Sequence, residues 1–237
     1  MIEIINGNFS YKENIGIKDL NIKISKGTTA CILGPNGTGK TTLLKILMGI
    51  YYLDNGKYYL EENLINKNFF KNNINAQKFY QKMGFVFQNS EVQLFNVSVY
   101  DEIAFGLKNM DLTNEDIIIR VKKCLELFDI EDLKYRVPYH LSGGQQKIVA
   151  IASILVTDPE VIILDEPFNG LSPKYRNLIC RIITNLKEKG KTVIIATHYL
   201  SSIIDIVDDI YYFSDNHSIK DKLTIKDLKN FPEFMDY

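Results

Sequence analysis

The segment GPNGTGKT, at residues 34–41, has the glycine and lysine spacing of a phosphate-binding loop. It follows the β-branched run TTACIL and leads into the apolar run TTLLKILMG, as such a loop must. Glycines let the backbone fold around the phosphates, the Lys40 ammonium supplies a positive charge, and the Thr41 hydroxyl can coordinate Mg²⁺. The predicted phosphate-binding residues are Asn36, Gly37, Thr38, Gly39, Lys40, Thr41 and Thr42.

Two adjacent carboxylates end a second apolar run, VIILDEP, at residues 161–167. Asp165 can hold Mg²⁺, and Glu166 can reach one residue further and polarise an attacking water. Two acids at a strand end are common as structural residues too, so the pair alone leaves both interpretations open. With the phosphate loop upstream, the pair indicates hydrolysis of a nucleoside triphosphate.

A second anion site is predicted at LSGGQ, residues 141–145. Ser142 is a helix-capping residue type, and the two glycines after it leave backbone N–H groups bare for an anion at a helix start. The same residues would also serve as an ordinary helix cap. The predicted binding residues are Ser142, Gly143, Gly144 and Gln145.

Positioning these groups requires strands that end at one edge of a sheet, and the chain alternates β-branched runs with helical patterns. The fold class predicted is therefore α/β, with a parallel sheet and an antiparallel sheet in the first sixty residues. Residues 66–82 are predicted to form a loop with one helical turn. The central strands are predicted at 28–33, 84–87, 161–164 and 192–197, and the antiparallel ones at 3–11, 17–25 and 56–60.

From about residue 98 to 156 the pattern is wholly helical. Ser98 with Asp101, and Thr113 with Asp116, have capping-box spacing before amphipathic runs. This segment separates two blocks of strands, so we expect a helical subdomain that projects from the α/β core. The helix start at Ser142 would then be unable to fold back onto the phosphate loop of its own chain.

Net charge does not distinguish between classes of function, and any nucleic-acid or lipid partner would have to be met by a local surface. A formal net charge of -1 gives no bulk attraction to nucleic acid or anionic lipid. The cysteines Cys31, Cys124 and Cys180 are expected to be buried thiols in a reducing compartment. The N-terminal residues lack a signal-peptide pattern, and no apolar run is long enough to span a bilayer. We expect an intracellular protein that is not embedded in a membrane.

The order of these motifs resembles that of the ABC ATPases. The phosphate loop, Gln88 after GFVF, LSGGQ, LDEP, and His198 after TVIIAT follow one another at the family's approximate spacing, over residues 2–213. The resemblance implies a P-loop NTPase with a RecA-like core, an antiparallel β subdomain and a helical subdomain. It also implies ATP and Mg²⁺ as ligands, and two subunits that meet head to tail, so that LSGGQ of one chain contacts the ATP of the other.

Further roles follow from the resemblance alone. Tyr11 corresponds to the aromatic residue that stacks on adenine, although plain packing would also explain it. Gln88 would reach Mg²⁺ and the attacking water, and His198 would contact the γ-phosphate and orient Glu166. The implied domain is a single nucleotide-binding domain over 1–237, with the core and β subdomain at about 1–88 and 157–213, a helical subdomain at about 89–156 and a tail at 214–237.

Two positions depart from the family pattern. Ser172 stands where the family usually has Asp, which puts communication between the two sites in doubt, while Ser172 and Pro173 still suit a helix start. Ile148 stands where many relatives carry Arg, which would weaken contacts near the partner's nucleotide.

Residues 85–107 are similar to the corresponding region of energy-coupling factor ATPases, including the cobalt and nickel importer type, although Ser90 replaces the usual proline. This implies a transport motor at the cytoplasmic face of the membrane, a homodimer or heterodimer with integral membrane subunits as partners and no nucleic acid. The groove for a membrane subunit would be lined by apolar residues that core packing would explain equally well. They are Phe95, Val97, Val99 and Phe105.

Alternatives remain at this stage. The chain could serve another class of ABC importer or exporter, act as a separate ABC protein on ribosomes or DNA, or be a regulatory subunit with low turnover. Glu166 and His198 argue against the regulatory subunit, whereas Ser172 leaves it open. In the tail, residues 224–230 are predicted to form one short helix. The cargo, expected to be a vitamin or a transition-metal ion, is chosen by other subunits.

Overall fold

A computed structural model describes residues 1–12, 14–225 and 227. The N-terminal part forms an antiparallel sheet in the order β2-β1-β4-β5. Ile2 of β1 pairs with Ile24 of β2 on one side and with Leu60 of β4 on the other, and all three side chains are buried. The predicted antiparallel sheet is therefore present. Its strands are β1 (Ile2–Tyr11), β2 (Asn14–Ile24), β4 (Asn55–Leu60) and β5 (Asn63–Leu64).

A second sheet has six strands in the order β10-β9-β3-β8-β7-β6, and all neighbours run parallel except β9 and β10. Every residue of β3, β6, β7 and β8 is buried, as expected for central parallel strands covered on both faces. The four predicted central strands are thus confirmed. The strands are β3 (Thr29–Leu33), β6 (Met83–Val86), β7 (Val161–Asp165), β8 (Thr192–Thr197), β9 (Asp209–Phe213) and β10 (Ile219–Thr224).

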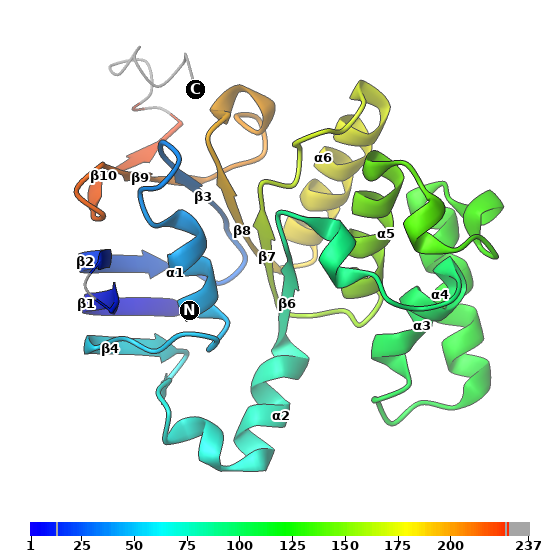
Figure 1. The fold of residues 1–237 in the computed structure, drawn as a ribbon, viewed down its shortest axis with the longest axis horizontal. Helices are drawn as coiled ribbons and strands as arrows, with labels where there is room; N and C mark the ends of the chain where they lie inside the picture. The colour runs from blue at the N-terminus through cyan, green and yellow to red at the C-terminus, as the bar shows by residue number, and fades with distance from the viewer. Residues whose placement is uncertain (13, 226, 228–237) are drawn as a thin grey trace.

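Helices cover this sheet on both faces (Figure 1). One apolar core joins the six-stranded sheet to α1 and the antiparallel sheet, and the other joins it to α3, α4, α5 and α6. Each of these last four helices has the N-cap that the sequence predicted, with a side-chain hydroxyl that accepts a hydrogen bond from a backbone N–H group of the first turn. The N-cap residues are Ser98, Thr113, Ser142 and Ser172. The helices are α1 (Lys40–Leu47), α2 (Asn73–Lys82), α3 (Val99–Leu107), α4 (Asn114–Phe128), α5 (Gly143–Leu155) and α6 (Pro173–Glu188).

Helix α2 corrects the prediction of a loop with one helical turn at residues 66–82. The Asn72 side chain caps the helix by accepting from the backbone N–H groups of Ile74 and Asn75. Phe79 is 2% exposed and packs edge-on against Phe70, with ring centroids 5.0 Å apart. Tertiary packing of aromatic rings therefore stabilises a helix that its polar sequence alone did not indicate. The 3₁₀ turns are Phe69–Lys71, Ser90–Gln93, Glu131–Leu133, Pro138–His140 and Leu200–Ser202.

Three further expectations change. Strand β10 forms an antiparallel edge of the six-stranded sheet and lies in the region predicted as a tail. Most of the predicted helix at 224–230 lies outside the described residues. Cys180 is half-buried rather than buried, unlike Cys31 and Cys124. Val99 is fully buried, so it belongs to the core and is wrong as a groove residue.

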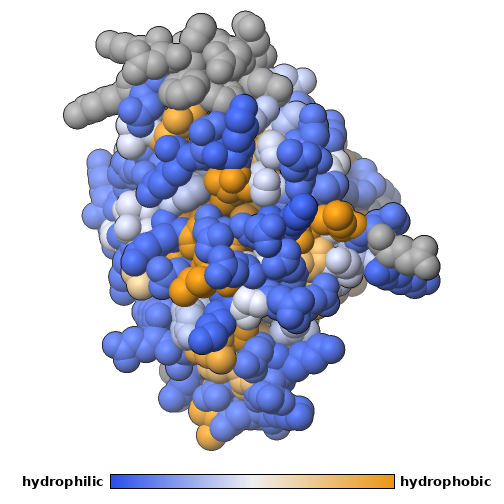
Figure 2. Space-filling model, turned by 90° about the vertical axis from the view of Figure 1, so that its left-hand side faces the viewer, coloured by the Kyte–Doolittle hydropathy of each residue, from blue (hydrophilic) through white to orange (hydrophobic). Residues whose placement is uncertain are grey.

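The surface beside the antiparallel sheet is largely hydrophilic, with smaller apolar areas in its middle (Figure 2). Within the described part of the chain, no helix has both the length and the apolar character needed to cross a membrane.

Candidate functional site

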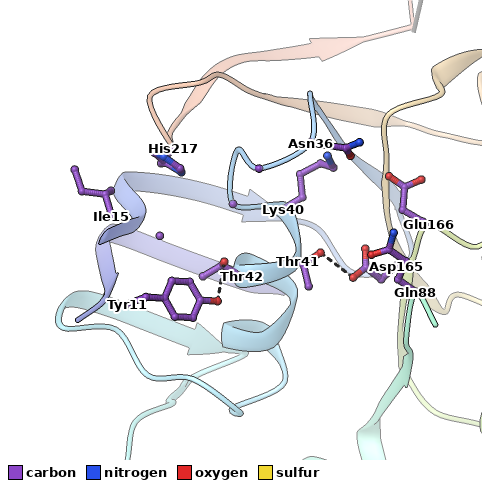
Figure 3. A pocket seen from close by; sticks show the side chains of 13 residues that line it. Tyr11, Ile15, Asn36, Lys40, Thr41, Thr42, Gln88, Asp165, Glu166 and His217 are labelled. Atoms are coloured by element: carbon purple, nitrogen blue, oxygen red, sulfur yellow. Dashed lines mark hydrogen bonds between the residues drawn. The ribbon is translucent and has the colours of Figure 1, made fainter. Parts of the chain in front are cut away.

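A cavity of about 450 Å³ lies where β3, β6 and β7 end at one edge of the sheet (Figure 3). Parallel strands bring their carboxyl ends together, so side chains from distant parts of the chain converge there. Most of the residues predicted for phosphate binding and catalysis line this cavity. The lining residues are Tyr11, Ile15, Gly16, Asn36, Gly37, Gly39, Lys40, Thr41, Thr42, Gln88, Asp165, Glu166 and His217.

The phosphate loop turns tightly between β3 and α1. Gly39 has φ 108°, and a Cβ atom there would lie 2.5 Å from the Gly16 carbonyl oxygen, so glycine is required. The Lys40 ammonium donates to the carbonyl oxygens of Gly34 and Pro35 at 2.7 and 2.8 Å. The Thr38 hydroxyl donates to Pro35 at 3.0 Å, so its side chain braces the loop instead of lining the cavity.

Asp165 and Thr41 form a cluster of oxygen donors at the cavity wall. The Thr41 hydroxyl donates to Asp165 Oδ2 at 2.9 Å, and Gln88 lines the same cavity. Burial raises the pKa of Asp165 and the nearby Glu166 carboxylate raises it further, while the bond from Thr41 opposes both. Hydroxyl, carboxylate and amide oxygens are the donors that Mg²⁺ prefers, so this set fits the predicted ion.

Glu166 is held in a fixed position at the end of β7. Its backbone has φ 48°, in the left-handed region that is uncommon for residues other than glycine. Its carboxylate accepts from the Thr197 hydroxyl at 3.2 Å and is hydrogen-bonded to His198 Nδ1 at 2.6 Å. The sequence-predicted pair of Glu166 and His198 is therefore in contact. His198 stands behind Glu166 rather than among the residues that line the cavity.

Tyr11 both lines the cavity and packs with other rings. Its hydroxyl and Thr42 Oγ1 are 3.0 Å apart, and its ring meets Phe9 and Tyr51 edge-on at 4.9 and 5.5 Å. The residue is nevertheless 39% exposed and lines the cavity, so part of it remains accessible to a ligand. Packing and ligand contact are compatible at this position.

Ser142, Gly143 and Gly144 line a different cavity, of about 490 Å³, and Gln88 borders both cavities. The Ser142 backbone N–H donates to Gln145 Oε1 at 3.1 Å, and Gln145 N–H donates back to Ser142 Oγ at 3.4 Å. Gln145 thus completes the cap of α5. The lining residues are Gln88, Asn89, Ser90, Glu91, Ser142, Gly143, Gly144, Gln146, Lys147, Asn169, Gly170, Ser172 and Tyr175.

Sequence reasoning missed three residues of the first cavity, Ile15, Gly16 and His217. His217 lies in the turn between β9 and β10, with φ 58°, and its backbone carbonyl accepts from Lys18 N–H at 2.9 Å. Its Nδ1 atom is buried with no hydrogen-bond partner among the described residues. No local signal identifies His217, because only the pairing of β10 with β9 brings this turn to the cavity.

Comparison with known proteins identifies the family. The family model for ABC transporter matches residues 17–169. The nickel import ATP-binding protein LarO of Lactiplantibacillus plantarum is 38% identical over 98% of this chain and 96% of its own length. The energy-coupling factor transporter ATP-binding protein EcfA of Carboxydothermus hydrogenoformans is 36% identical over 87% of this chain and 75% of its own.

Solved structures have the same fold. The structure of cbiO1 from Clostridium perfringens, part of the ABC transporter complex cbiONQ, has a TM-score of 0.85 and 32% identity, covering 98% of this chain and 91% of its own. A dimeric ATP-binding cassette in a post-hydrolysis state, bound to ADP and Pi, has a TM-score of 0.85 and 27% identity over 95% of this chain and 99% of its own. The chain therefore belongs to the ABC transporter family, as one of its ATP-hydrolysing subunits.

Proposed function

We propose that two chains of this architecture bind ATP at the seam between them. Each ATP contacts the phosphate loop of one chain and Ser142, Gly143 and Gly144 of the other. The main support is that the loop and the LSGGQ segment line separate cavities of one chain, so each chain offers two halves of different sites. The second chain is either a copy of this one or a similar ATPase.

Within each site, Thr41, Gln88 and Asp165 hold Mg²⁺, which when bound neutralises charge on the phosphates. The Lys40 ammonium, now bound to the carbonyl groups of its own loop, turns to the phosphate oxygens. Burial lowers the pKa of Lys40, but the carboxylates of Glu166 and Asp165 counter this and favour the charged form that phosphate needs. Backbone N–H groups of the loop and of α1 supply the remaining donors.

Glu166 accepts a proton from the attacking water. Glu166 is 4% exposed, and its carboxylate is held between Thr197 and His198, so few rotamers are open to it. His198 orients this carboxylate through its Nδ1 atom, which lies 2.6 Å from Glu166 Oε1. Tyr11 stacks on the adenine ring, and its T-shaped contacts with Phe9 and Tyr51 hold its ring in place.

A third cavity, of about 380 Å³, offers a site for a membrane subunit. Phe95 and Phe105 line it, are 66% and 44% exposed, and pack edge-on with centroids 4.9 Å apart. Tyr80 of α2 and Met110 after α3 also line it. The cavity is therefore bounded on one side by α2, next to the α/β core, and on the other by the helical part of the chain that contains α3. An apolar helix from an integral membrane subunit fits this position, and its movement would follow any rotation between those two parts.

We assign the transporter to the energy-coupling factor type, importing a vitamin or a transition-metal ion from a position at the cytoplasmic face of the membrane. Support comes from the nickel import protein, from EcfA and from cbiO1, which are similar to this chain over most of its length. The cargo itself is selected by membrane subunits rather than by this chain.

The seam is tested by complementation between two inactive variants. Lys40→Ala removes the phosphate-loop charge. Gly143→Asp adds a carboxylate to the second cavity, and the position accepts a Cβ without steric conflict because no atom lies within 4 Å of it. Each variant alone should lose ATPase activity. In a 1:1 mixture, half of the dimers are mixed and each has one intact site, so roughly a quarter of the wild-type activity should return.

Retention of full activity by Gly143→Asp alone, at a rate per chain that does not depend on concentration, would exclude the seam. If both variants are inactive and mixing restores nothing, the second chain is a similar ATPase rather than a copy. The same complementation is then made with that chain.

A further inference from the structure

Lys147 is a buried lysine that the functions described above leave without a role. It lies in α5, four residues after Gly143, so both residues share one face of the helix. Its side chain lines the second cavity together with Gly143, yet the residue is only 5% exposed. It therefore lies directly behind the surface that meets the partner's phosphate.

The Lys147 ammonium reaches across to the loop that follows β7. It donates to the carbonyl oxygen of Glu166 at 3.1 Å and to that of Asn169 at 3.2 Å. Both acceptors are backbone atoms, so the contact fixes the path of the chain rather than a side chain. One of the two acceptor residues, Glu166, is the proposed general base.

Keeping a charge at this position is costly. Burial lowers the pKa of Lys147, and the negative charges of Glu166 and Asp165 counter this. A buried ammonium has an effective desolvation cost of several kcal/mol, which hydrogen bonds and nearby charges must offset. An apolar side chain would anchor α5 without that cost, as its neighbour Ile148 does at 0% exposure.

The backbone that Lys147 holds is one that needs support. Glu166 has a left-handed φ of 48°, a conformation that costs on the order of 1–3 kcal/mol unless the surroundings impose it. The Glu166 backbone N–H donates to Ala196 at 2.9 Å on one side, and its carbonyl accepts from Lys147 on the other. These two bonds set the direction in which the carboxylate leaves the end of β7 toward the first cavity.

We propose that Lys147 is a positioning residue that connects the two ATP sites of the dimer. ATP of the partner chain binds at the start of α5 and sets the position of that helix. Lys147 carries this position to the backbone of Glu166, which acts on the chain's own ATP. The proposal rests on the seam proposed above, and it offers a route between the sites despite the family's missing aspartate at Ser172.

The first test separates binding from turnover. Lys147→Met keeps the approximate length of the side chain and removes its hydrogen-bond donors, whereas Lys147→Arg keeps donors. The control is Lys122→Met, which removes a lysine with a 77% exposed side chain from α4. We expect Lys147→Met to bind ATP within twofold of wild type and to lose about 10- to 100-fold in kcat, because small displacements of a catalytic group have such effects. Lys147→Arg should recover most of the loss, and the control should match wild type.

The second test asks which chain of the dimer needs Lys147, and it also applies if the single variant is unstable. In the mixed dimer described above, the Gly143→Asp chain supplies Glu166 to the working site, and the Lys40→Ala chain supplies its LSGGQ segment. Because Lys147 contacts the Glu166 carbonyl oxygen even without ATP at the start of α5, adding Lys147→Met to the Gly143→Asp chain should lower the restored rate at least tenfold. Adding it to the Lys40→Ala chain should lower the rate much less.

Equal effects on the two chains, or a larger effect on the Lys40→Ala chain, would overturn the proposal, because Lys147 would then serve only the LSGGQ segment. Unchanged kcat in Lys147→Met would overturn it as well. If the mixture of Lys40→Ala and Gly143→Asp chains does not regain activity, the result bears on the proposed ATP site between two copies of this chain and not on Lys147. The test is then repeated with the similar ATPase that completes the dimer.

Discussion

Replacing Glu166 by glutamine should remove the proton acceptor and leave its framework intact. The backbone bonds to Ala196 and from Lys147 do not involve the side chain. The glutamine amide oxygen can still accept from His198 Nδ1, and its N–H₂ group can donate to the Thr197 hydroxyl, which lies 3.2 Å from the carboxylate in the wild type. The change is therefore confined to acid–base chemistry.

The expected magnitude follows from the role of a general base. A positioned base contributes about 10²- to 10⁴-fold in rate, which is about 2.7–5.4 kcal/mol at 1.36 kcal/mol for each factor of ten. Glu166 and Asp165 are 4% and 3% exposed, so their negative charges are poorly screened near the ATP phosphates. Removing one of them should leave ATP affinity equal or higher while turnover falls at least a hundredfold.

The assay measures single-turnover release of phosphate at saturating Mg²⁺–ATP, with ATP affinity measured separately by calorimetry. Glu188→Gln, which changes an exposed carboxylate in α6, is the matched control and should behave as wild type. A variant at Glu166 that hydrolyses ATP at the wild-type rate would show that another group accepts the proton, and the mechanism proposed here would be wrong.

Three more predictions concern other parts of the site. Asp165→Asn should abolish Mg²⁺-dependent turnover yet stabilise the nucleotide-free protein in urea denaturation. Because the folded-state pKa of Asp165 is raised above its unfolded value, the protonated carboxyl favours the folded state at acid pH, and this contribution is lost as pH rises through the folded-state pKa. The gain from Asp165→Asn should therefore be larger at about pH 7.5 than at about pH 3, which lies below the ordinary pKa of an aspartate, by about 1.4 kcal/mol for each unit of raised pKa. An equal gain at both pH values would contradict this. Tyr11→Ala should weaken ATP binding about 5- to 10-fold, or about 1 kcal/mol, in a fluorescence titration. Tyr11→Phe loses only the hydroxyl contact with Thr42 and should retain most of the affinity. Equal losses of affinity in the two variants would assign the effect to that hydroxyl. Phe105 is 44% exposed and lines the third cavity. Phe105→Glu should leave ATPase activity unchanged and abolish co-purification with the membrane subunits. Retained co-purification would exclude this cavity as their docking site.

Local sequence was sufficient for those features whose physical cause is local. The phosphate loop depends on glycines at fixed intervals, and the caps of α3, α4, α5 and α6 depend on a hydroxyl at one position and a helical run after it. The four central strands were found because burial on both faces requires continuous apolar residues. In contrast, α2 was missed because its stability comes from the packing of Phe79 against Phe70, and helical propensity does not reflect such a tertiary contact.

By itself, the sequence determined which residues are able to bind phosphate, hold Mg²⁺ and accept a proton, since those abilities belong to side-chain types at short spacings. Only the tertiary structure decided which of them meet. It joined Thr41 to Asp165, set Glu166 against His198, and brought His217 to the cavity through the turn after β9. It also put Ser142 in a cavity apart from the phosphate loop and buried Lys147 against the backbone of Glu166. Such contacts join residues far apart in the chain, and they form only when the strands pair and the helices pack, which no local spacing encodes.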